Sequence, residues 1–529
     1  MPAVTSSSRA PTAEPRLGAP APPPQRARAA GLSRAVGLAV VSGVALWAAQ
    51  EPLGWAPLGF VALVPALLVA SDGPRGALVG AVAGFAYFGL LLNWVLVFGW
   101  FAWLPLVAAL AVEMVALCWL AGRARRAGWP LWQRLLVLPS VLVVLEWVRD
   151  RWPLGGFTWG ELGASQAPAG FTRAAAAVGG VALLTWLVAA VNVVAAAAVE
   201  RIRTRSGALW APAGVVAAIA VVFAAAWLGR PAAPPSGSLA VGVVQANTFE
   251  GSRVATDDMI AAHLGATADL VGAAHDAGRL DLIVWGESSL LTADPTQALA
   301  ARVVAVSTGV PVLANASVLS PDTPTFENTT VLFTADGVAD RYVKRHLVPF
   351  GERVPLRDLL GFIGSLQQVP RDAVGGSEPG IFEVDGTTLG TITCFETVFP
   401  DPARELVDLG ARALVFTTNN ASFRRSAEPD QYLALTRLRA TETHRAITLT
   451  AVSGKSATID PDGAIHDTTG LFTRETLRWD MPLQDDRTLF TRLGHWAAWA
   501  SVVALVLGAA LPVLARRRGL GRSRGGEVQ

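Results

Sequence analysis

Lysine and cysteine are nearly absent from this chain of 529 residues. Among its 43 lysine and arginine residues only Lys344 and Lys455 are lysines, and the only thiols are those of Cys118 and Cys394. Because Cys118 lies in the middle of an apolar run, Cys394 has no partner for a disulfide, and a framework of structural disulfides is excluded. A lysine kept in a chain that otherwise uses arginine marks a position that needs a compact ammonium group with an adjustable pKa. Lys344 and Cys394 are therefore the first candidates for chemistry.

Charged residues are scarce as well. They make up 16% of the chain, against 52% hydrophobic residues, and the mean hydropathy is +0.42. A net charge of +2 over this length gives no sign of the basic surface that nucleic acid requires. The composition therefore favours an integral membrane protein, with no nucleic-acid partner, over a soluble enzyme.

Eight apolar stretches have a length suited to crossing the hydrocarbon core of a bilayer. They cover residues 33–50, 55–71, 76–98, 101–122, 133–149, 174–199, 208–228 and 493–515. Arginines cluster before the first stretch, after the second, fourth and sixth, and after the last. With eight spans all these clusters fall on one side of the membrane, which the positive-inside rule makes cytoplasmic. We therefore expect a multi-pass protein of the bacterial cytoplasmic (inner) membrane, with both termini in the cytoplasm and the segment before the last span on the extracytoplasmic side.

The segment before the last span has the composition of a soluble α/β domain, in which short apolar runs alternate with helical patterns. The predicted strands are 239–245, 282–285, 310–314, 329–334, 388–394, 413–418 and 447–452, and the predicted helices are 255–276, 399–409 and 428–444. The whole chain is expected to divide into a disordered cytoplasmic tail (1–31), a membrane domain of about seven transmembrane helices (32–229), a linker (230–238), the α/β domain (239–490), a last transmembrane helix (491–516) and a basic cytoplasmic tail (517–529).

Three residues of the α/β domain are candidates for catalysis. Glu287 follows the apolar strand 282–285, at the kind of strand end where α/β folds place functional groups. Cys394 ends the strand 388–394, where a nucleophile is exposed and backbone N–H groups can face a substrate carbonyl. A thiol needs a base or a nearby cation to become a nucleophile, and Glu287 can supply the base and Lys344 the cation. Taken singly, each residue has an ordinary alternative: a solvated acid, a surface cation and a buried inert thiol.

In this order and with their flanking residues, the three resemble the Glu–Lys–Cys triad of the nitrilase (carbon–nitrogen hydrolase) superfamily. The stretch Lys344–Glu352, Lys-Arg-His-Leu-Val-Pro-Phe-Gly-Glu, matches the family pattern almost continuously. With spans on both sides, the chain is similar to the apolipoprotein N-acyltransferases over residues 32–515, and Glu146-Trp147, Gly156–Trp159 and Gln166 add to the likeness. The resemblance implies a multi-span α-helical membrane domain joined to an extracytoplasmic, nitrilase-like α/β domain, an αββα sandwich.

The resemblance also implies an activity. Enzymes of this family transfer a fatty acyl chain from a glycerophospholipid to the α-amino group of the diacylglyceryl-modified cysteine of an apolipoprotein, by ping-pong chemistry through a thioester. By resemblance Cys394 would carry the thioester, Glu287 would act as base and acid, and Lys344 would stabilise the oxyanion. The residues that would support the site are Glu352, Glu396 and Phe395. No metal or other cofactor is implied, and the partners are the phospholipid donor, the lipoprotein acceptor and the lipid bilayer.

Several departures from the family pattern lie near these residues. The family's Trp-Pro-Glu is Trp-Gly-Glu here, with Gly286 in place of proline, and the tyrosine after the nucleophile is Phe395. The family's Asn-Asp-Ala-Trp-Phe-Gly loop is Asn-Asn-Ala-Ser-Phe-Arg. By resemblance this loop, with Asn419, Ser422 and Phe423, lies on the substrate side. The changes are expected to affect acceptor preference and rate, with the triad intact.

Two other functions fit the same residues. A membrane-tethered amidase of the nitrilase superfamily would use the same triad on a small amide, although a small soluble substrate needs no flanking spans. A degenerate homologue acting as a non-catalytic membrane scaffold would account for the altered loop. The retention of Lys344 and Cys394 in a chain so poor in both residue types argues against the scaffold.

Overall fold

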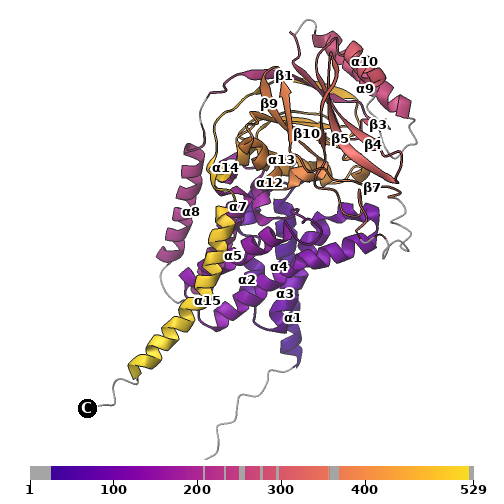
Figure 1. Ribbon diagram of the computed structural model, residues 1–529. Coiled ribbons are helices and arrows are strands. Elements are labelled where there is room, and N and C mark those ends of the chain that lie inside the picture. The colour runs from indigo at the N-terminus through magenta and orange to yellow at the C-terminus, as the bar shows by residue number, and fades with distance from the viewer. Residues whose placement is uncertain are drawn as a thin grey trace, which may run out of the picture.

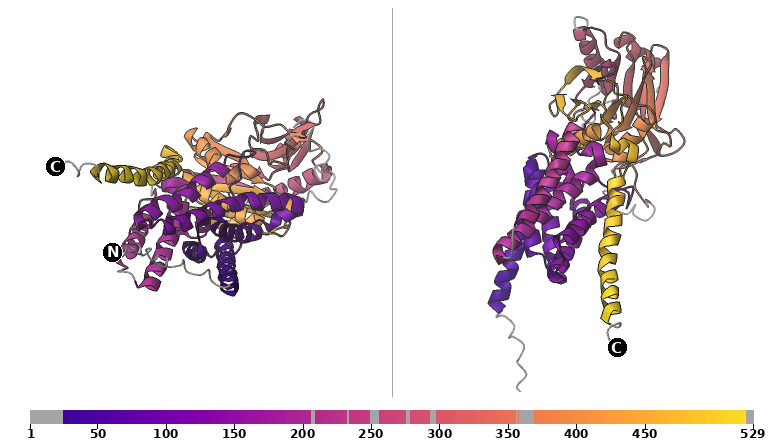
Figure 2. Two further views of the ribbon diagram at one scale, coloured as in Figure 1. Left: turned by 90° about the horizontal axis from the view of Figure 1, so that it is seen from below. Right: turned by 90° about the vertical axis from the view of Figure 1, so that its left-hand side faces the viewer.

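The computed structural model describes residues 25–205, 209–231, 234–248, 256–274, 278–292, 297–355, 357 and 369–523. A bundle of apolar helices lies below a two-sheet α/β domain, and the last helix of the chain runs back along the bundle (Figures 1 and 2). The tail predicted for residues 1–31 lies outside the described residues up to residue 24, and its remainder belongs to the first helix. Residues 524–529 of the second predicted tail also lie outside them.

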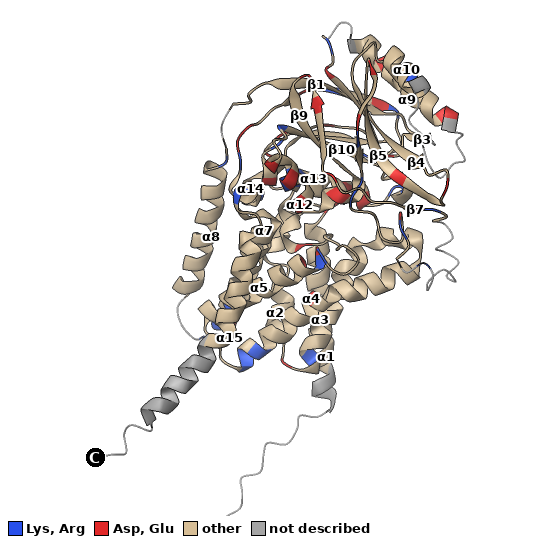
Figure 3. Ribbon diagram, viewed as in Figure 1, with Lys and Arg blue, Asp and Glu red and all other residues tan. Residues whose placement is uncertain are grey.

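The bundle is built from helices that carry few charges. Its elements are α1 (Gln25–Ala49), η1 (Ala56–Phe60), α2 (Val64–Val69), α3 (Pro74–Leu91), η2 (Asn93–Phe98), α4 (Trp100–Arg126), α5 (Leu131–Arg149), η3 (Leu162–Gln166), α6 (Gly170–Arg173), α7 (Ala176–Thr204), α8 (Trp210–Leu228) and α15 (Trp496–Ser523). Among the described residues, α1, α3, α4, α5, α7 and α8 are long and apolar enough to cross a membrane. Charged residues gather in the α/β domain and at the far end of the bundle (Figure 3). The multi-span membrane domain is thus confirmed.

The second predicted span, residues 55–71, is not one continuous helix. It folds as η1 followed by the six-residue helix α2, and a proline stands near the start of each piece. Asn192 of α7 satisfies the backbone at the break: its Nδ2 donates to Gly59 O (2.7 Å) and its Oδ1 accepts from the N–H of Leu63 (2.9 Å). A helix interrupted at membrane depth needs partners of this kind for the backbone groups that it frees.

The α/β domain contains two sheets. The first has the strand order β14–β1–β2–β4–β5–β6, with β3 beside β4 and β7 beside β5, and the second has the order β13–β12–β11–β10–β9–β8. The strands of the first sheet are β1 (Ser238–Gln245), β2 (Leu282–Trp285), β3 (Leu290–Thr292), β4 (Val312–Leu319), β5 (Thr325–Thr334), β6 (Gly337–Val343), β7 (Asp372–Ala373) and β14 (Glu475–Pro482). Those of the second are β8 (Gly380–Val384), β9 (Thr387–Thr393), β10 (Ala413–Thr418), β11 (Ile447–Ala451), β12 (Ala457–Ile459) and β13 (Ile465–Thr468). Strands β1, β2 and β4 are parallel to one another, as are β9, β10 and β11.

The two sheets pack face to face between two layers of helices. Val241 and Val284 of the first sheet share a buried core with Phe382 and Val415 of the second. Helices α9 (Thr256–Ala274) and α10 (Gln297–Val306) cover the outer face of the first sheet. Helices α12 (Pro400–Asp408) and α13 (Glu428–Thr443) cover that of the second. This is the expected αββα sandwich, and the short elements η5 (Cys394–Val398), η6 (Ala421–Phe423) and α14 (Leu489–Leu493) complete it.

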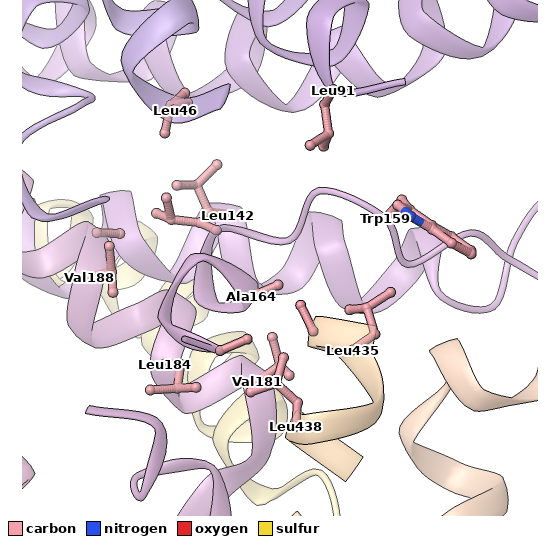
Figure 4. Close-up of a cluster of buried hydrophobic side chains, with 14 of the residues drawn as sticks. Leu46, Leu91, Leu142, Trp159, Ala164, Val181, Leu184, Val188, Leu435 and Leu438 are labelled. Atoms are coloured by element: carbon pink, nitrogen blue, oxygen red, sulfur yellow. The ribbon is translucent and has the colours of Figure 1, made fainter. Parts of the chain in front are cut away.

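The α/β domain and the bundle share one hydrophobic core. Leu435 and Leu438 of α13 lie among Ala164, Val181 and Leu184 of the bundle (Figure 4). The second sheet, α12 and α13 belong to the same buried cluster as the membrane helices. The inner helical layer of the sandwich is therefore also the layer that rests on the membrane domain.

A buried carboxylate holds the loop that joins α5 to α7 against the α/β domain. Glu146 Oε1 accepts the backbone N–H of Leu162 (2.8 Å), and its Oε2 accepts the hydroxyl of Thr185 (2.6 Å). The loop reaches the sandwich through Thr158, whose hydroxyl donates to the carbonyl of Val398 in η5 (3.0 Å). The element η5 begins at Cys394, so the membrane domain contacts the segment that carries the predicted nucleophile.

Candidate active site

The carboxyl ends of β2, β9 and β10 meet at one edge of the sandwich, and two of the predicted residues follow them. Glu287 is 5% exposed, and its backbone N–H donates to the carbonyl of Thr418 at the end of β10 (3.2 Å). A Cβ on Gly286 would lie 2.6 Å from the backbone nitrogen of Val452, beside the end of β11. The two sheets approach too closely here for a side chain, which explains why this chain carries glycine where the family pattern has proline.

Lys344 is the centre of a buried hydrogen-bond network. Its side chain is fully buried, and its Nζ donates to Glu287 Oε1 (3.2 Å) and to Glu352 Oε1 (2.9 Å). The Nδ2 of Asn328 donates to the same two oxygens (2.8 and 2.9 Å), and Glu352 Oε2 accepts the N–H of Val348 (2.8 Å). Burial by itself lowers the pKa of Lys344, but the two carboxylates outweigh it and raise that pKa well above its ordinary value. The ammonium therefore stays charged at this site.

Cys394 lies on a sharp turn between β9 and η5. Its φ is +49°, in the left-handed region that few residues other than glycine adopt. The hydroxyl of Tyr432 on α13 stabilises the turn: it donates to the carbonyl of Cys394 (3.0 Å), and it shares a second hydrogen bond with the hydroxyl of Thr397 (2.7 Å). The residue as a whole is partly exposed, although its thiol is buried. A strained strand-to-helix turn of this kind presents a nucleophile to substrate.

The thiol of Cys394 responds to the charges around it. Burial raises its pKa well above the usual value and the Glu287 carboxylate raises it further, while the Lys344 ammonium and a hydrogen bond with Thr418 offset this only in part. The resting thiol is therefore protonated and requires a base when substrate binds. The structure thus brings Glu287, Lys344 and Cys394 into one electrostatically coupled group.

Glu396 ties together the two strand ends that carry Lys344 and Cys394. Its fully buried carboxylate accepts hydrogen bonds of 2.8–3.0 Å from the backbone N–H groups of Thr393, Arg345 and His346 and from the hydroxyl of Tyr342. Burial alone raises the pKa of Glu396, but these donors and the His346 side chain hold it below its ordinary value. An ionised carboxylate with this many donors fixes the geometry of the backbone beside both reactive groups.

A row of aromatic side chains leads from the nucleophile to the bundle. Phe395 stacks on Trp159 (ring centroids 6.4 Å apart, planes at 13°), and Trp159 packs on Trp94 of η2 (5.5 Å). Phe423 of the loop predicted to lie on the substrate side contacts both Trp94 (5.0 Å) and Phe98 (5.8 Å). Phe98 is 46% exposed. We call these five residues the aromatic row; it connects the neighbour of Cys394 with an exposed part of the membrane domain.

Asn420, which stands where the family pattern has aspartate, faces the buried Glu428. Its Nδ2 donates to both carboxylate oxygens of Glu428 (3.1 and 2.8 Å), and its Oδ1 accepts from the hydroxyl of Thr418 (3.0 Å). Burial raises the pKa of Glu428 to about 8. An aspartate at position 420 would place two carboxylates side by side, so asparagine is the residue that suits Glu428. Because Thr418 also bonds to the Cys394 thiol, this pair is connected to the nucleophile.

The other two predicted loop residues are Asn419, which lies just before the short helix η6, and Ser422, which lies within it. Asn419 Oδ1 accepts the backbone N–H of Ala421 (3.2 Å), which begins η6. Ser422 is exposed. Of the predicted loop residues, Phe423 is the one that packs on aromatic side chains of the membrane domain, Trp94 and Phe98.

Three residues at the site were not identified from the sequence: Asn328, Tyr342 and Tyr432. The chain has only 3 tyrosines, and two of them bond to groups beside Cys394. The argument from rarity that singles out lysine would therefore have found them. Asn328 carries no comparable signal, because its role depends on the face of β5 that turns toward Lys344.

Comparison with known proteins covers both halves of the chain. The family described as apolipoprotein N-acyltransferase N-terminal domain matches residues 42–194, and the carbon–nitrogen hydrolase family matches residues 240–488. The apolipoprotein N-acyltransferase of Gloeobacter violaceus is 32% identical over 92% of this chain and 94% of its own. That of Mycolicibacterium smegmatis is 29% identical over 92% of this chain and 85% of its own. Nit3 of Saccharomyces cerevisiae, a nitrilase-superfamily structure, covers 47% of this chain and 91% of its own, with 18% identity and a TM-score of 0.36.

The apolar helices and the carbon–nitrogen hydrolase domain define the class: an integral membrane enzyme of the nitrilase fold. The relatives match across both domains and over nearly their full length. The chain belongs to the apolipoprotein N-acyltransferase family, and its activity is the N-acylation of lipoproteins. Family membership decides against the amidase.

Proposed function

We propose that the chain transfers a fatty acyl chain from a glycerophospholipid to the α-amino group of a diacylglyceryl-modified cysteine, through a thioester on Cys394. One observation carries the proposal. The Cys394 thiol feels the charges of the buried Glu287–Lys344 pair, and the next residue, Phe395, stacks on Trp159 of the aromatic row. Both substrates keep acyl chains in the bilayer, so a nucleophile connected to the membrane domain in this way is placed to meet them.

The first half-reaction forms the thioester. Glu287 takes the proton of the Cys394 thiol, and the sulfur attacks the ester carbonyl of the phospholipid. The ammonium of Lys344 has three N–H groups, of which the described contacts use two. The third is donated to the developing oxyanion together with the backbone N–H that follows Cys394. The bond between the carbonyl carbon and the glycerol oxygen then breaks, Glu287 returns the proton to that oxygen, and a lysophospholipid leaves.

The second half-reaction discharges the thioester. The neutral α-amino group of the acceptor attacks the thioester carbonyl, and Glu287 accepts the proton that the nitrogen loses. The carbon–sulfur bond breaks, the proton passes to sulfur, and the amide product leaves with the Cys394 thiol restored. Glu352 holds the Lys344 ammonium in place, and Glu396 fixes the ends of the strands that carry Lys344 and Cys394. Phe395 is the first residue of the aromatic row. No step calls for a metal or a cofactor.

The distribution of arginine sets the proposed orientation. Arg125 and Arg126 end α4, Arg134 lies at the start of α5, and Arg201 and Arg203 lie in the last turn of α7. Basic residues gather at the end of the bundle away from the α/β domain (Figure 3). The positive-inside rule makes that end cytoplasmic. The catalytic domain then lies on the extracytoplasmic side of the bacterial cytoplasmic membrane, with both termini inside.

Intact-protein mass spectrometry tests the acyl-enzyme. Full-length protein in detergent is incubated with phosphatidylethanolamine or phosphatidylglycerol, and a diacylglyceryl-modified peptide is then added. We expect a mass gain of one fatty acyl chain that hydroxylamine removes and that the peptide discharges. Cys394→Ala should abolish the gain, and Cys118→Ala, which removes the other thiol, should retain it. Acylation that survives in Cys394→Ala, or a wild-type protein that no phospholipid acylates, would refute the proposal.

A further inference from the structure

Two arginines form the outer end of the substrate-side loop. Arg424 and Arg425 directly follow Phe423 of the aromatic row, and both are exposed. Arg424 has φ +56° and ψ −143°, a backbone conformation that suits glycine, and glycine is the residue of the family pattern at this position. Backbone strain of this kind persists where the surrounding structure or a function requires it. The loop therefore holds an arginine where glycine would fit more easily.

The two guanidinium groups are not neutralised by neighbouring acids. Among the described residues no carboxylate forms an ion pair with Arg424 or Arg425, and Arg425 lies over the ring of Phe472, 5.5 Å from its centroid. Asp430, a partly exposed acid that follows along the chain, is paired with Lys455. Within the described part of the chain, the loop therefore presents two positive charges that have no anionic partner.

The position of the arginines matches the path of a lipid substrate. Phe423 contacts Phe98 of η2, and Leu96, Val97 and Phe98 are 47%, 42% and 46% exposed. An acyl chain that extends from Cys394 along the aromatic row reaches this apolar surface of the membrane domain. In a glycerophospholipid the phosphodiester is only a few bonds from the ester. The loop that carries the two arginines begins directly after Thr418, which bonds to the Cys394 thiol. We therefore expect a donor with its ester at the nucleophile to have its phosphate on the side of this loop.

We propose that Arg424 and Arg425 bind the phosphodiester of the donor phospholipid and so place its ester carbonyl at Cys394. Guanidinium groups suit this role because they donate paired, charge-assisted hydrogen bonds to phosphate oxygens. The inference rests on the proposed acyl-enzyme and adds to it the group that the enzyme recognises in its donor. Arg424 is the contact that the family pattern, with glycine at that position, lacks.

Acylation kinetics with two kinds of donor test the phosphate site. The rate of acyl-enzyme formation is followed by intact mass against the mole fraction of donor in detergent micelles. Phosphatidylglycerol supplies the phosphodiester, and p-nitrophenyl palmitate supplies an activated acyl ester without phosphate. The variants are Arg424→Gly, Arg424→Lys and the double variant Arg424→Gly with Arg425→Gln. Arg302→Gln serves as control, because Arg302 is an exposed arginine on α10, at the end of the α/β domain farthest from the bundle (Figure 1).

We expect Arg424→Gly to raise the apparent KM for phosphatidylglycerol about tenfold, the loss typical of one charge-assisted hydrogen bond. The double variant should lose more and Arg424→Lys less, with p-nitrophenyl palmitate unaffected and Arg302→Gln like wild type. An unchanged KM for phosphatidylglycerol in the double variant would overturn the proposal. So would an equal loss with both donors, which would show that the loop only supports the fold. A wild-type protein acylated by neither donor would instead refute the acyl-enzyme itself, and the phosphate site with it.

Discussion

Replacing Glu428 with glutamine is expected to stabilise the protein at alkaline pH. The residue is 2% exposed, and burial raises its pKa to about 8, although the hydrogen bond from Asn420 lowers it somewhat. In an unfolded chain a glutamate has a pKa of about 4.3. The folded state therefore binds this proton more tightly, so stability is greatest below about pH 4 and falls as the pH rises through about 8. Glutamine carries no charge, and its side-chain oxygen can still accept the hydrogen bond from Asn420.

The size of the effect follows from the two pKa values. A difference of nearly four pH units at about 1.4 kcal/mol each gives a ceiling of about 5 kcal/mol above pH 8. Water that accompanies the carboxylate reduces this cost, so we expect a gain of about 2–4 kcal/mol at pH 9. For a protein of this length about 1–2 °C of Tm corresponds to each kcal/mol. The Glu428→Gln variant should then melt about 2–8 °C above wild type at pH 9 and at nearly the same temperature at pH 5.

Tryptophan fluorescence during heating in detergent measures this difference. Melting curves are recorded at pH 5, 7 and 9 for wild type, Glu428→Gln and the control Glu383→Gln, which removes an exposed carboxylate on β8. The control should follow wild type at each pH. A Tm difference that is the same at all three pH values would refute the reasoning, because a change in packing does not titrate. A loss of stability at pH 9 would show that Glu428 is held as a carboxylate by contacts stronger than those described.

Three further predictions concern the site. Lys344→Arg should slow acylation of Cys394 about 100- to 1,000-fold by intact-mass kinetics, because a planar guanidinium does not fit a fully buried ammonium position between two carboxylates; near-normal acylation would contradict this. Gly286→Ala should lower stability by about 1–3 kcal/mol, because its Cβ would lie 2.6 Å from the nitrogen of Val452; an unchanged Tm would show that the sheets can separate. Tyr432→Phe should lower stability by about 1 kcal/mol and slow acylation with the donor KM unchanged, because it removes the hydrogen bond to the carbonyl of Cys394; a wild-type rate would count against that brace.

The central strands could be predicted from the sequence because burial on both faces makes them continuous apolar runs. The predictions 282–285 and 413–418 match β2 and β10 residue for residue. Strands at the sheet edges were missed: β13 is largely exposed and β14 alternates with charged residues, so neither gives an apolar run. The prediction of one continuous span across residues 55–71 was wrong for a local reason, because prolines divide this stretch into η1 and α2.

The sequence singles out three candidate reactive residues that the structure brings together, but it does not predict the contacts that hold them. Lys344 and Cys394 stand out by their rarity and Glu287 by its strand end. Asn328 bonds to Glu287 across 41 positions and Tyr432 to Cys394 across 38, so both contacts depend on how the sheets and α13 pack. The loop at residues 419–424 shows the same limit. From the sequence, Asn420 is only a departure from the aspartate of the family pattern, whereas the structure shows that it faces the buried carboxylate of Glu428.

Helix α13 makes the position of the nucleophile depend on the membrane bundle. Tyr432 holds the carbonyl of Cys394, and the preceding Gln431 accepts a hydrogen bond from Trp94 Nε1 in η2 (3.0 Å). Near the other end of the helix, Glu442 accepts the backbone N–H at which α7 resumes after its break (3.0 Å). One helix is thus fixed to the bundle near both ends and to the catalytic turn near its start. The α/β domain thus supplies the proposed Glu–Lys–Cys group, and its packing on the membrane helices fixes where the Cys394 thiol lies relative to the bundle.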